Sequence, residues 1–215
     1  MRLAVFSIVL AVSVPALAVE PLGISEDEFK MYQHYKLALE DQRVQAMKPE
    51  QRTTAIAKDA GYKLKELQKA IEKGEAAGDV KAKCEANLKE IFSQGELAGR
   101  AGKLEVDTSA AHAVAYVQWL NEKPEALTVE ACFAAAKAAE ACPIASSIQV
   151  WAQDKASPRT RVFQALISSG SASRIKPDKV RDFADTRYMK LFEKVKSVTN
   201  GDDLSSDSGT TAAKP

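Results

Sequence analysis

The sequence of 215 residues is poor in the residues that build recognisable catalytic or metal sites. It has three cysteines and two histidines, no C-x-x-C pair, and neither a G-x-S-x-G nor an H-E-x-x-H motif. No local zinc spacing and no thioredoxin-like redox motif are therefore present. His34 and His112 lie outside any catalytic motif, and we expect each to occupy an ordinary position in an amphipathic helix. The sequence predicts no cofactor and no metal site, and it favours a protein that is not an enzyme.

Two stretches resemble known motifs but lack essential residues. The stretch 95–104 fails the phosphate-binding pattern G-x-x-x-x-G-K-[ST] at two positions. Ser173 and Lys176 form an S-x-x-K pair, but Pro177 follows at once and disfavours the helical geometry that this nucleophile pair needs at the lysine. Neither stretch therefore predicts an activity.

Long apolar runs are missing after the first eighteen residues. Residues 1–18 place Arg2 before an apolar run over 3–14, then Pro15 and the A-x-A pattern of Ala16, Leu17 and Ala18, as in a secretory signal peptide with its cleavage site. The run is shorter than the roughly 20 residues of a membrane-spanning helix. We therefore expect a mature chain without a transmembrane segment, located outside the cytoplasm, most naturally in a periplasm and otherwise secreted.

Excess charge of either sign is also absent, because 30 basic residues face 29 acidic ones. This balance argues against nucleic acid as a partner. Locally the balance breaks: residues 104–154 carry two basic and seven acidic side chains, whereas 155–196 carry eleven basic and four acidic ones. Internal pairing of the two regions is the favoured interpretation, and peripheral contact with an anionic surface is the alternative. The residues of this possible basic binding surface are Arg181, Arg187, Lys190, Lys194 and Lys196.

Alternating β-branched runs are rare, whereas apolar residues recur at helical spacing. Ser25 and Glu28 have the spacing of a capping box before a helix over about 26–47. A second helix from Pro49 and a third after Asp79 are predicted to form an antiparallel αα-hairpin. Further helices are expected over about 107–120, from Thr128 through the alanine-rich stretch, over 144–155 and 158–169, and over 177–198.

The predicted fold is therefore all-α, a compact bundle of about six to eight helices with an N-terminal αα-hairpin. The signal peptide spans 1–18 and the helical domain 19–199, with two possible subdomains meeting near 104–127. Residues 200–215 are small, polar and acidic, so we expect a disordered C-terminal tail.

The three cysteines predict one disulfide and one unpaired thiol in an oxidising compartment. Cys132 and Cys142 are ten positions apart in one expected helix, which separates their α-carbons by about 15 Å, and a disulfide tolerates about 7 Å. Helical phase places Cys132 on the apolar face of its helix, and Cys84 lies on the apolar stripe of another. The preferred pair is Cys84 with Cys132, and Cys84 with Cys142 is the alternative.

These patterns favour an exported helical protein that binds or scaffolds protein or other components of the cell envelope. The alternative is a small extracytoplasmic hydrolase whose catalytic groups meet only in the fold.

Overall fold

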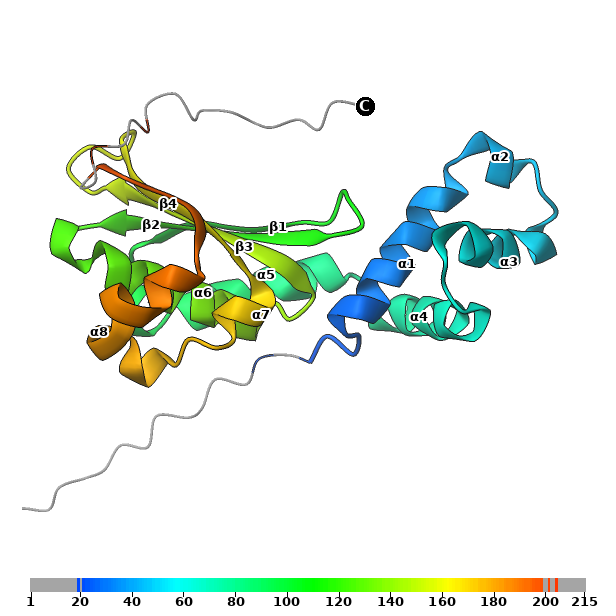
Figure 1. Cartoon of the computed structure of the whole chain (residues 1–215), viewed down its shortest axis with the longest axis horizontal. Coiled ribbons are helices and arrows are strands. Elements are labelled where there is room, and N and C mark those ends of the chain that lie inside the picture. The colour runs from blue at the N-terminus through cyan, green and yellow to red at the C-terminus, as the bar shows by residue number, and fades with distance from the viewer. Residues whose placement is uncertain (1–18, 20, 199–200, 202–203, 205–215) are drawn as a thin grey trace, which may run out of the picture.

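The computed structural model describes residues 19, 21–198, 201 and 204 and shows a mixed α/β protein (Figure 1). The expected all-α bundle is wrong, because the second half of the chain builds a five-stranded sheet. The expected signal peptide over 1–18 and most of the expected tail over 200–215 lie outside the described residues. Of the tail, Gly201 and Leu204 are described, and Leu204 is buried.

The N-terminal part contains α1 (Glu26–Leu39), α2 (Gln42–Gln45), α3 (Pro49–Ala60) and α4 (Leu64–Ala77). The capping box is confirmed, since the Ser25 hydroxyl accepts from the Glu28 amide while the Glu28 carboxylate accepts from the Ser25 amide. Pro49 opens α3 as expected, and Gly61 ends it in a left-handed conformation, with φ of 72°. These helices enclose a small core of their own, which contains Val44, Ile56, Ala57 and Leu67.

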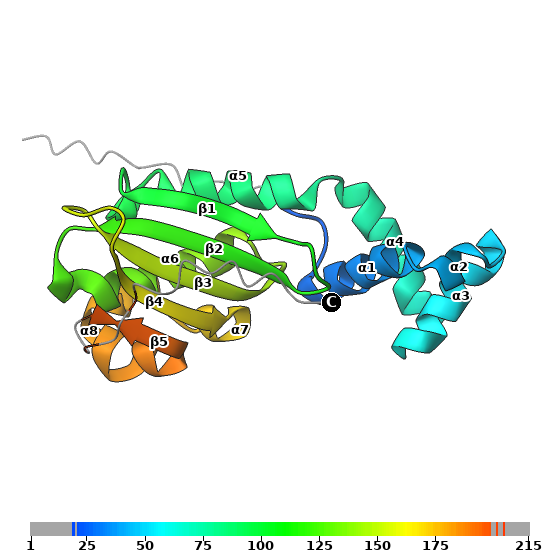
Figure 2. The ribbon, with the colours of Figure 1, turned by 90° about the horizontal axis from the view of Figure 1, so that it is seen from above.

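The expected αα-hairpin is wrong in its partners. Helix α4 packs mainly on α1, with Gly74 against the ring of Tyr32, while α5 (Val80–Phe92) leaves the helical part and packs beside the sheet (Figure 2). Asp79 does cap α5, because its carboxylate accepts from the Ala82 amide at 2.9 Å.

The sheet contains β1 (Ala101–Asp107), β2 (Ala113–Asn121), β3 (Ala145–Asp154), β4 (Arg161–Ser168) and β5 (Glu193–Ser197) in the order 1-2-3-4-5. Strands β2 and β3 are parallel, and the other neighbouring pairs are antiparallel. A parallel pair needs a crossover connection, which α6 (Leu127–Ala141) supplies.

Strand β2 shows why the helix expected over 107–120 is wrong. Its residues alternate, with Ala113, Ala115, Val117 and Trp119 at most 1 % exposed and the residues between them half-buried. This period of two is the signature of a strand, but small alanines hide it where β-branched residues would show it. The helices expected over 144–155 and 158–169 are also wrong, because these stretches are mainly β3 and β4.

Helices α5 and α6 lie on one side of the sheet, and no helix of the described residues covers the other side (Figures 1 and 2). The alanines of α6 are largely buried, which lets this helix lie close to the strands. The remaining short helices are η1 (Gly95–Leu97), η2 (Pro124–Ala126), α7 (Ser169–Ala172), η3 (Pro177–Lys179), α8 (Val180–Phe183), η4 (Ala184–Tyr188) and η5 (Met189–Leu191). The single helix expected over 177–198 is thus replaced by short helical turns and the edge strand β5.

The disulfide joins Cys84 to Cys142, with 5.0 Å between their α-carbons, and Cys132 is a buried free thiol. The preferred pairing with Cys132 is therefore corrected to the alternative. The helix does hold Cys132 and Cys142 apart as expected, but Cys142 lies just beyond its last residue, with non-helical φ of −131° and ψ of 71°. Helical phase does not apply to a residue outside the helix, so Cys142 is able to turn toward α5.

None of the helices in the described part of the chain is both long and apolar enough to cross a membrane.

Candidate binding groove

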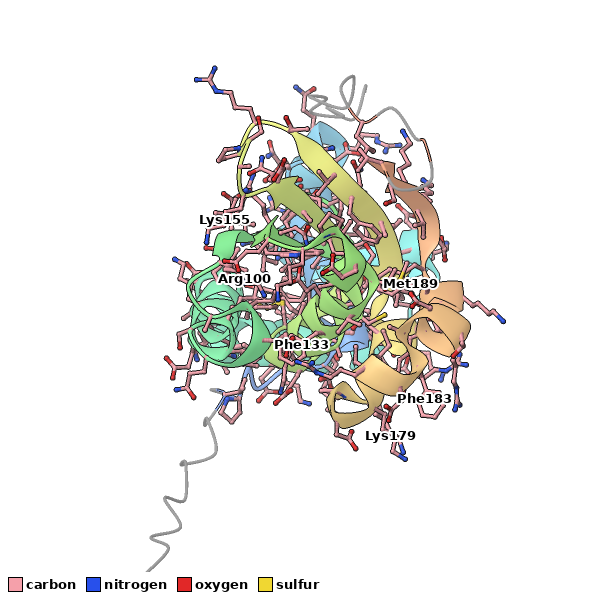
Figure 3. The ribbon with its side chains drawn as sticks, turned by 90° about the vertical axis from the view of Figure 1, so that its left-hand side faces the viewer. Arg100, Phe133, Lys155, Lys179, Phe183 and Met189 are labelled. Atoms are coloured by element: carbon pink, nitrogen blue, oxygen red, sulfur yellow. A yellow bond between two sulfur atoms is a disulfide. The ribbon has the colours of Figure 1, made fainter. Side chains whose placement is uncertain are left out.

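A groove of about 700 Å³ opens where the helical layer ends before the sheet does. Helix α6 packs over β2 and β3. Near the N-terminal end of α6, the same side of β4 and β5 is therefore bordered only by η2 and the C-terminal turns among the described residues. Figure 3 views this end of the molecule, with Met189 beside α6. The lining consists of Pro124, Glu125, Leu127, Thr128, Phe163, Asp185, Met189, Lys190, Val195 and Ser197.

The floor of the groove is apolar. Phe163 is 1 % exposed and its ring lies 6.3 Å from that of Trp119, which ties the floor to the core. Met189 covers Cys132, whose thiol Sγ donates to the Met189 Sδ at 3.9 Å. Burial, together with the charge of Asp185, raises the pKa of the Cys132 thiol to about 12. This cysteine is therefore protonated at neutral pH and acts as a packing residue behind the groove, because a reactive cysteine needs its thiolate.

Charged side chains stand at the rim. Glu125, Asp185 and Lys190 are exposed, and Thr128 is half-buried on the first turn of α6. A ligand with an apolar body would therefore meet the floor, while a polar end would meet carboxylate, ammonium and hydroxyl groups of the rim. This combination of an apolar surface with a few polar groups is usual for small-molecule sites.

A buried carboxylate holds one wall of the groove in place. Glu130, 3 % exposed, accepts from Arg100 Nη1 at 2.6 Å, from Trp119 Nε1 at 2.7 Å and from Asn121 Nδ2 at 2.9 Å. These bonds tie the first half of α6 to the end of β2, and Arg100 also donates to the Leu120 carbonyl at 3.2 Å. Because both carboxylate oxygens are satisfied, the network fixes the helix beside the groove.

Comparisons with protein-family models, curated proteins and solved structures gave no match.

The basic residues singled out in the sequence do not share one helix. They are spread over α8, η4, η5 and β5, and of the five only Lys190 lines the groove. Arg181 pairs with Glu96 at 2.8 Å, but Glu96 lies outside the acidic region 104–154, so this ion pair is not the pairing of the two regions that the sequence predicts. Lys194 has φ of 51° and lies between two β5 residues whose pairing with β4 is shifted, so it forms a bulge on the edge strand. A charged, bulged edge discourages pairing with another sheet.

The two histidines lie far from the groove and from each other. His34 lines a cavity of about 260 Å³ between α1, α2 and α3, together with Asp41, Arg43 and Asp59. Its Nδ1 lies 3.1 Å from the Tyr62 hydroxyl, and within the described residues it bonds to neither carboxylate of that cavity.

His112 lies just before β2, with its Nδ1 3.4 Å from the Ser146 hydroxyl. Ser146 is the extra residue where the register of β2 and β3 shifts, so its position depends on the sheet. No group of three or more His, Cys, Asp or Glu side chains in the described part of the chain is arranged to hold a metal ion.

Sequence reasoning missed the groove because its lining comes from η2, α6, β4 and the C-terminal turns, which share no local motif. One signal was present: Glu130 is a carboxylate within an otherwise alanine-rich helix. A charged residue on a helix with so little polar surface is a candidate for a buried, paired position.

Proposed function

We propose that the protein is an extracytoplasmic binding protein of the cell envelope, periplasmic or otherwise secreted, that holds an apolar group of an envelope component in the groove. The observation that carries this proposal is the groove itself. Its volume of about 700 Å³ lies within the range of roughly 300–1,000 Å³ usual for ligand sites. The disulfide between Cys84 and Cys142 supports an oxidising compartment.

The direct test is a titration with N-phenyl-1-naphthylamine, a neutral apolar fluorophore. We expect saturable binding by the wild-type protein, and at least a roughly tenfold loss for Val195→Asp, because this substitution places a carboxylate on an apolar wall. Val198→Asp is the matched control, since Val198 is 43 % exposed and is not part of the lining. A second variant, Thr128→Trp, fills the groove without adding charge and should also abolish binding.

Circular dichroism of each variant shows whether it is folded. Equal affinity of wild type and both folded lining variants, or the absence of saturable binding by the wild type, would refute the assignment of the groove.

The hydrolase alternative is favoured by one observation, the pair of His112 and Ser146, which the fold brings together from positions 34 apart. A histidine beside a hydroxyl is the arrangement that activates a serine nucleophile, although at 3.4 Å the two are further apart than a strong hydrogen bond. If this alternative holds, p-nitrophenyl acetate is turned over by the wild type and no longer by Ser146→Ala, while Val195→Asp retains the activity.

A further inference from the structure

One face of the sheet, over which no helix of the described residues lies, combines aromatic side chains with amides (Figure 1). On β2 and β3 the core-facing side chains, such as Val117 and Val150, are fully buried, so their neighbours in sequence point to the other side. Figures 1 and 2 show that no helix of the described residues lies over that side. The polar and aromatic residues of this open face are Tyr116, Gln118, Gln149, Trp151, Gln153 and Gln164, and the apolar Val114, Leu120 and Leu166 lie on the same face.

The two aromatic residues are close neighbours on adjacent strands. The ring centroids of Tyr116 and Trp151 are 6.1 Å apart at an angle of 71°, so the rings meet edge to face. Arg161 lies over the Trp151 ring, and Lys103 approaches the Tyr116 ring, both at 6.0 Å. Tyr116 is half-buried and Trp151 is 9 % exposed, so Tyr116 offers the larger contact area.

The glutamine side chains around these rings have amide groups that are only partly hydrogen-bonded. Gln118 donates to Gln153, and Gln164 accepts from Arg161 Nη1 at 2.5 Å, which leaves a second amide atom of each glutamine for other partners. The side chains of Gln149 and Trp151 make no hydrogen bond within the described residues. This part of the sheet therefore presents donors and acceptors beside aromatic surface.

Charge on the open face is balanced. Strands β2 and β4 contribute only Arg161 to its centre, and β3 contributes no charged side chain there. On the border, Lys103 pairs with Glu105 at 2.8 Å, and Asp107 lies beside Val114 at the end of β1. Strand β5 adds one charge of each sign, since Lys196 pairs with Gln164 and Glu193 with Leu166. A polyanion or a cationic peptide would find little excess of opposite charge here, whereas an uncharged polar partner is complementary to such a face.

From these observations we propose that the open face binds a neutral glycan that carries acetamido groups. A pyranose ring has an apolar C–H face that packs on an aromatic ring, and hydroxyls around its edge that pair with amides. The acetamido group is itself an amide, so it matches the side chains of Gln149 and its neighbours in both donor and acceptor. Tyr116 would carry the stacking contact, and the edge of Trp151 would flank it.

N-acetylchitohexaose is the probe that tests this proposal. The protein has two tryptophans, and Trp119 is fully buried in the core, so a change in tryptophan emission reports on Trp151. We expect a saturable change in emission, and about a tenfold weaker affinity for Tyr116→Ala, since the stacking contact is lost. Phe183→Ala is the matched control, because Phe183 is 38 % exposed on α8, away from the open face (Figure 3).

Each of the following results would overturn the proposal: no saturable change with N-acetylchitohexaose, equal affinity of wild type and folded Tyr116→Ala, or equally tight binding of maltohexaose, which lacks acetamido groups. Affinity should also stay unchanged between about 50 and 500 mM salt, because a neutral ligand is not screened; a steep loss would indicate an ionic partner and contradict a neutral one. Val195→Asp should bind the sugar normally, so failure of the groove and failure of the open face are separable.

Discussion

Removing the disulfide should destabilise the protein by a predictable amount. The bond closes a loop between residues 58 positions apart, which in the chain-entropy model corresponds to about 4 kcal/mol of stabilisation. We therefore expect the free energy of unfolding of the double variant Cys84→Ala/Cys142→Ala to be lower than that of the wild type by about 4 kcal/mol for the lost cross-link. The packing lost with each of the two buried sulfurs should lower it by about 1 kcal/mol more. The bond stabilises mainly by restricting the unfolded chain, so the two native structures should be nearly the same.

The matched control is Cys132→Ala, which removes a buried sulfur without removing a cross-link. Its cost should be about 1 kcal/mol, the lost packing of one small group. Urea unfolding followed by the emission of the two buried tryptophans, Trp119 and Trp151, measures both values under identical conditions. A loss below about 1 kcal/mol for the double variant, or an equal loss for Cys132→Ala, would contradict the structural assignment.

Peptide mapping without reduction tests the pairing directly. Trypsin cleaves after Lys137, which separates Cys132 from Cys142, and it releases Cys84 within the peptide 84–89. We expect 84–89 to be linked to 138–155. A link from 84–89 to the peptide that ends at Lys137 would show that Cys132 is the true partner and would refute the pairing in the structure.

Two further predictions concern the N-terminal helices. Gly74→Ala should lower the free energy of unfolding in urea by about 1–2 kcal/mol although alanine favours helices, because the new Cβ would lie 2.3 Å from Tyr32 Cγ. Gly170 has open space around it, so Gly170→Ala is the control and should leave stability unchanged. Equal stability of the two variants would contradict the close packing of Gly74 on Tyr32. The hydrogen bond from Lys73 and those from Ser25 hold the pKa of Glu28 at about 2, below the ordinary 4.5, against the effect of burial. The stabilisation by ionised Glu28 should therefore be complete above pH 4.5 and be lost as the pH falls toward 2. Glu28→Gln should make the free energy of unfolding less dependent on pH in this range. An unchanged dependence would contradict the contacts of Glu28 with Lys73 and Ser25.

The starts of the first helices could be predicted because they depend on local chemistry, whereas the helix expected over 26–47 is in fact divided into α1 and α2. Ser25 with Glu28, Pro49 and Asp79 each satisfy or remove backbone groups within their own turn, so sequence spacing suffices to locate them. The strands could not be predicted in the same way. In β2, the alternating core positions begin with Ala113 and Ala115, and such residues are small because α6 lies close above them. That requirement comes from a helix later in the chain and is not visible within the strand.

The disulfide and the candidate groove likewise depend partly on local sequence and partly on contacts between distant segments. The helical rise correctly separated Cys132 from Cys142, but which of them reaches Cys84 depends on where α6 ends, a boundary that sequence reasoning fixes least well. The groove depends on the gap between α6 and β5, which no single segment encodes. Among the basic residues chosen from the sequence, Lys190 alone lines it, because the expected helix over 177–198 is broken into turns and a strand.

Strand β4 relates the two proposed surfaces. Successive side chains of a strand point to opposite faces, so Phe163 forms the floor of the groove while Gln164 belongs to the open face. The two sites therefore lie back to back on one sheet and share no side chain. A substitution in one should leave the other intact, and an apolar group and a glycan could be held at the same time. Simultaneous binding would allow the protein to link two envelope components, as a scaffold protein does. Competition between N-phenyl-1-naphthylamine and N-acetylchitohexaose would exclude this scaffold role, because the protein would then bind only one ligand at a time.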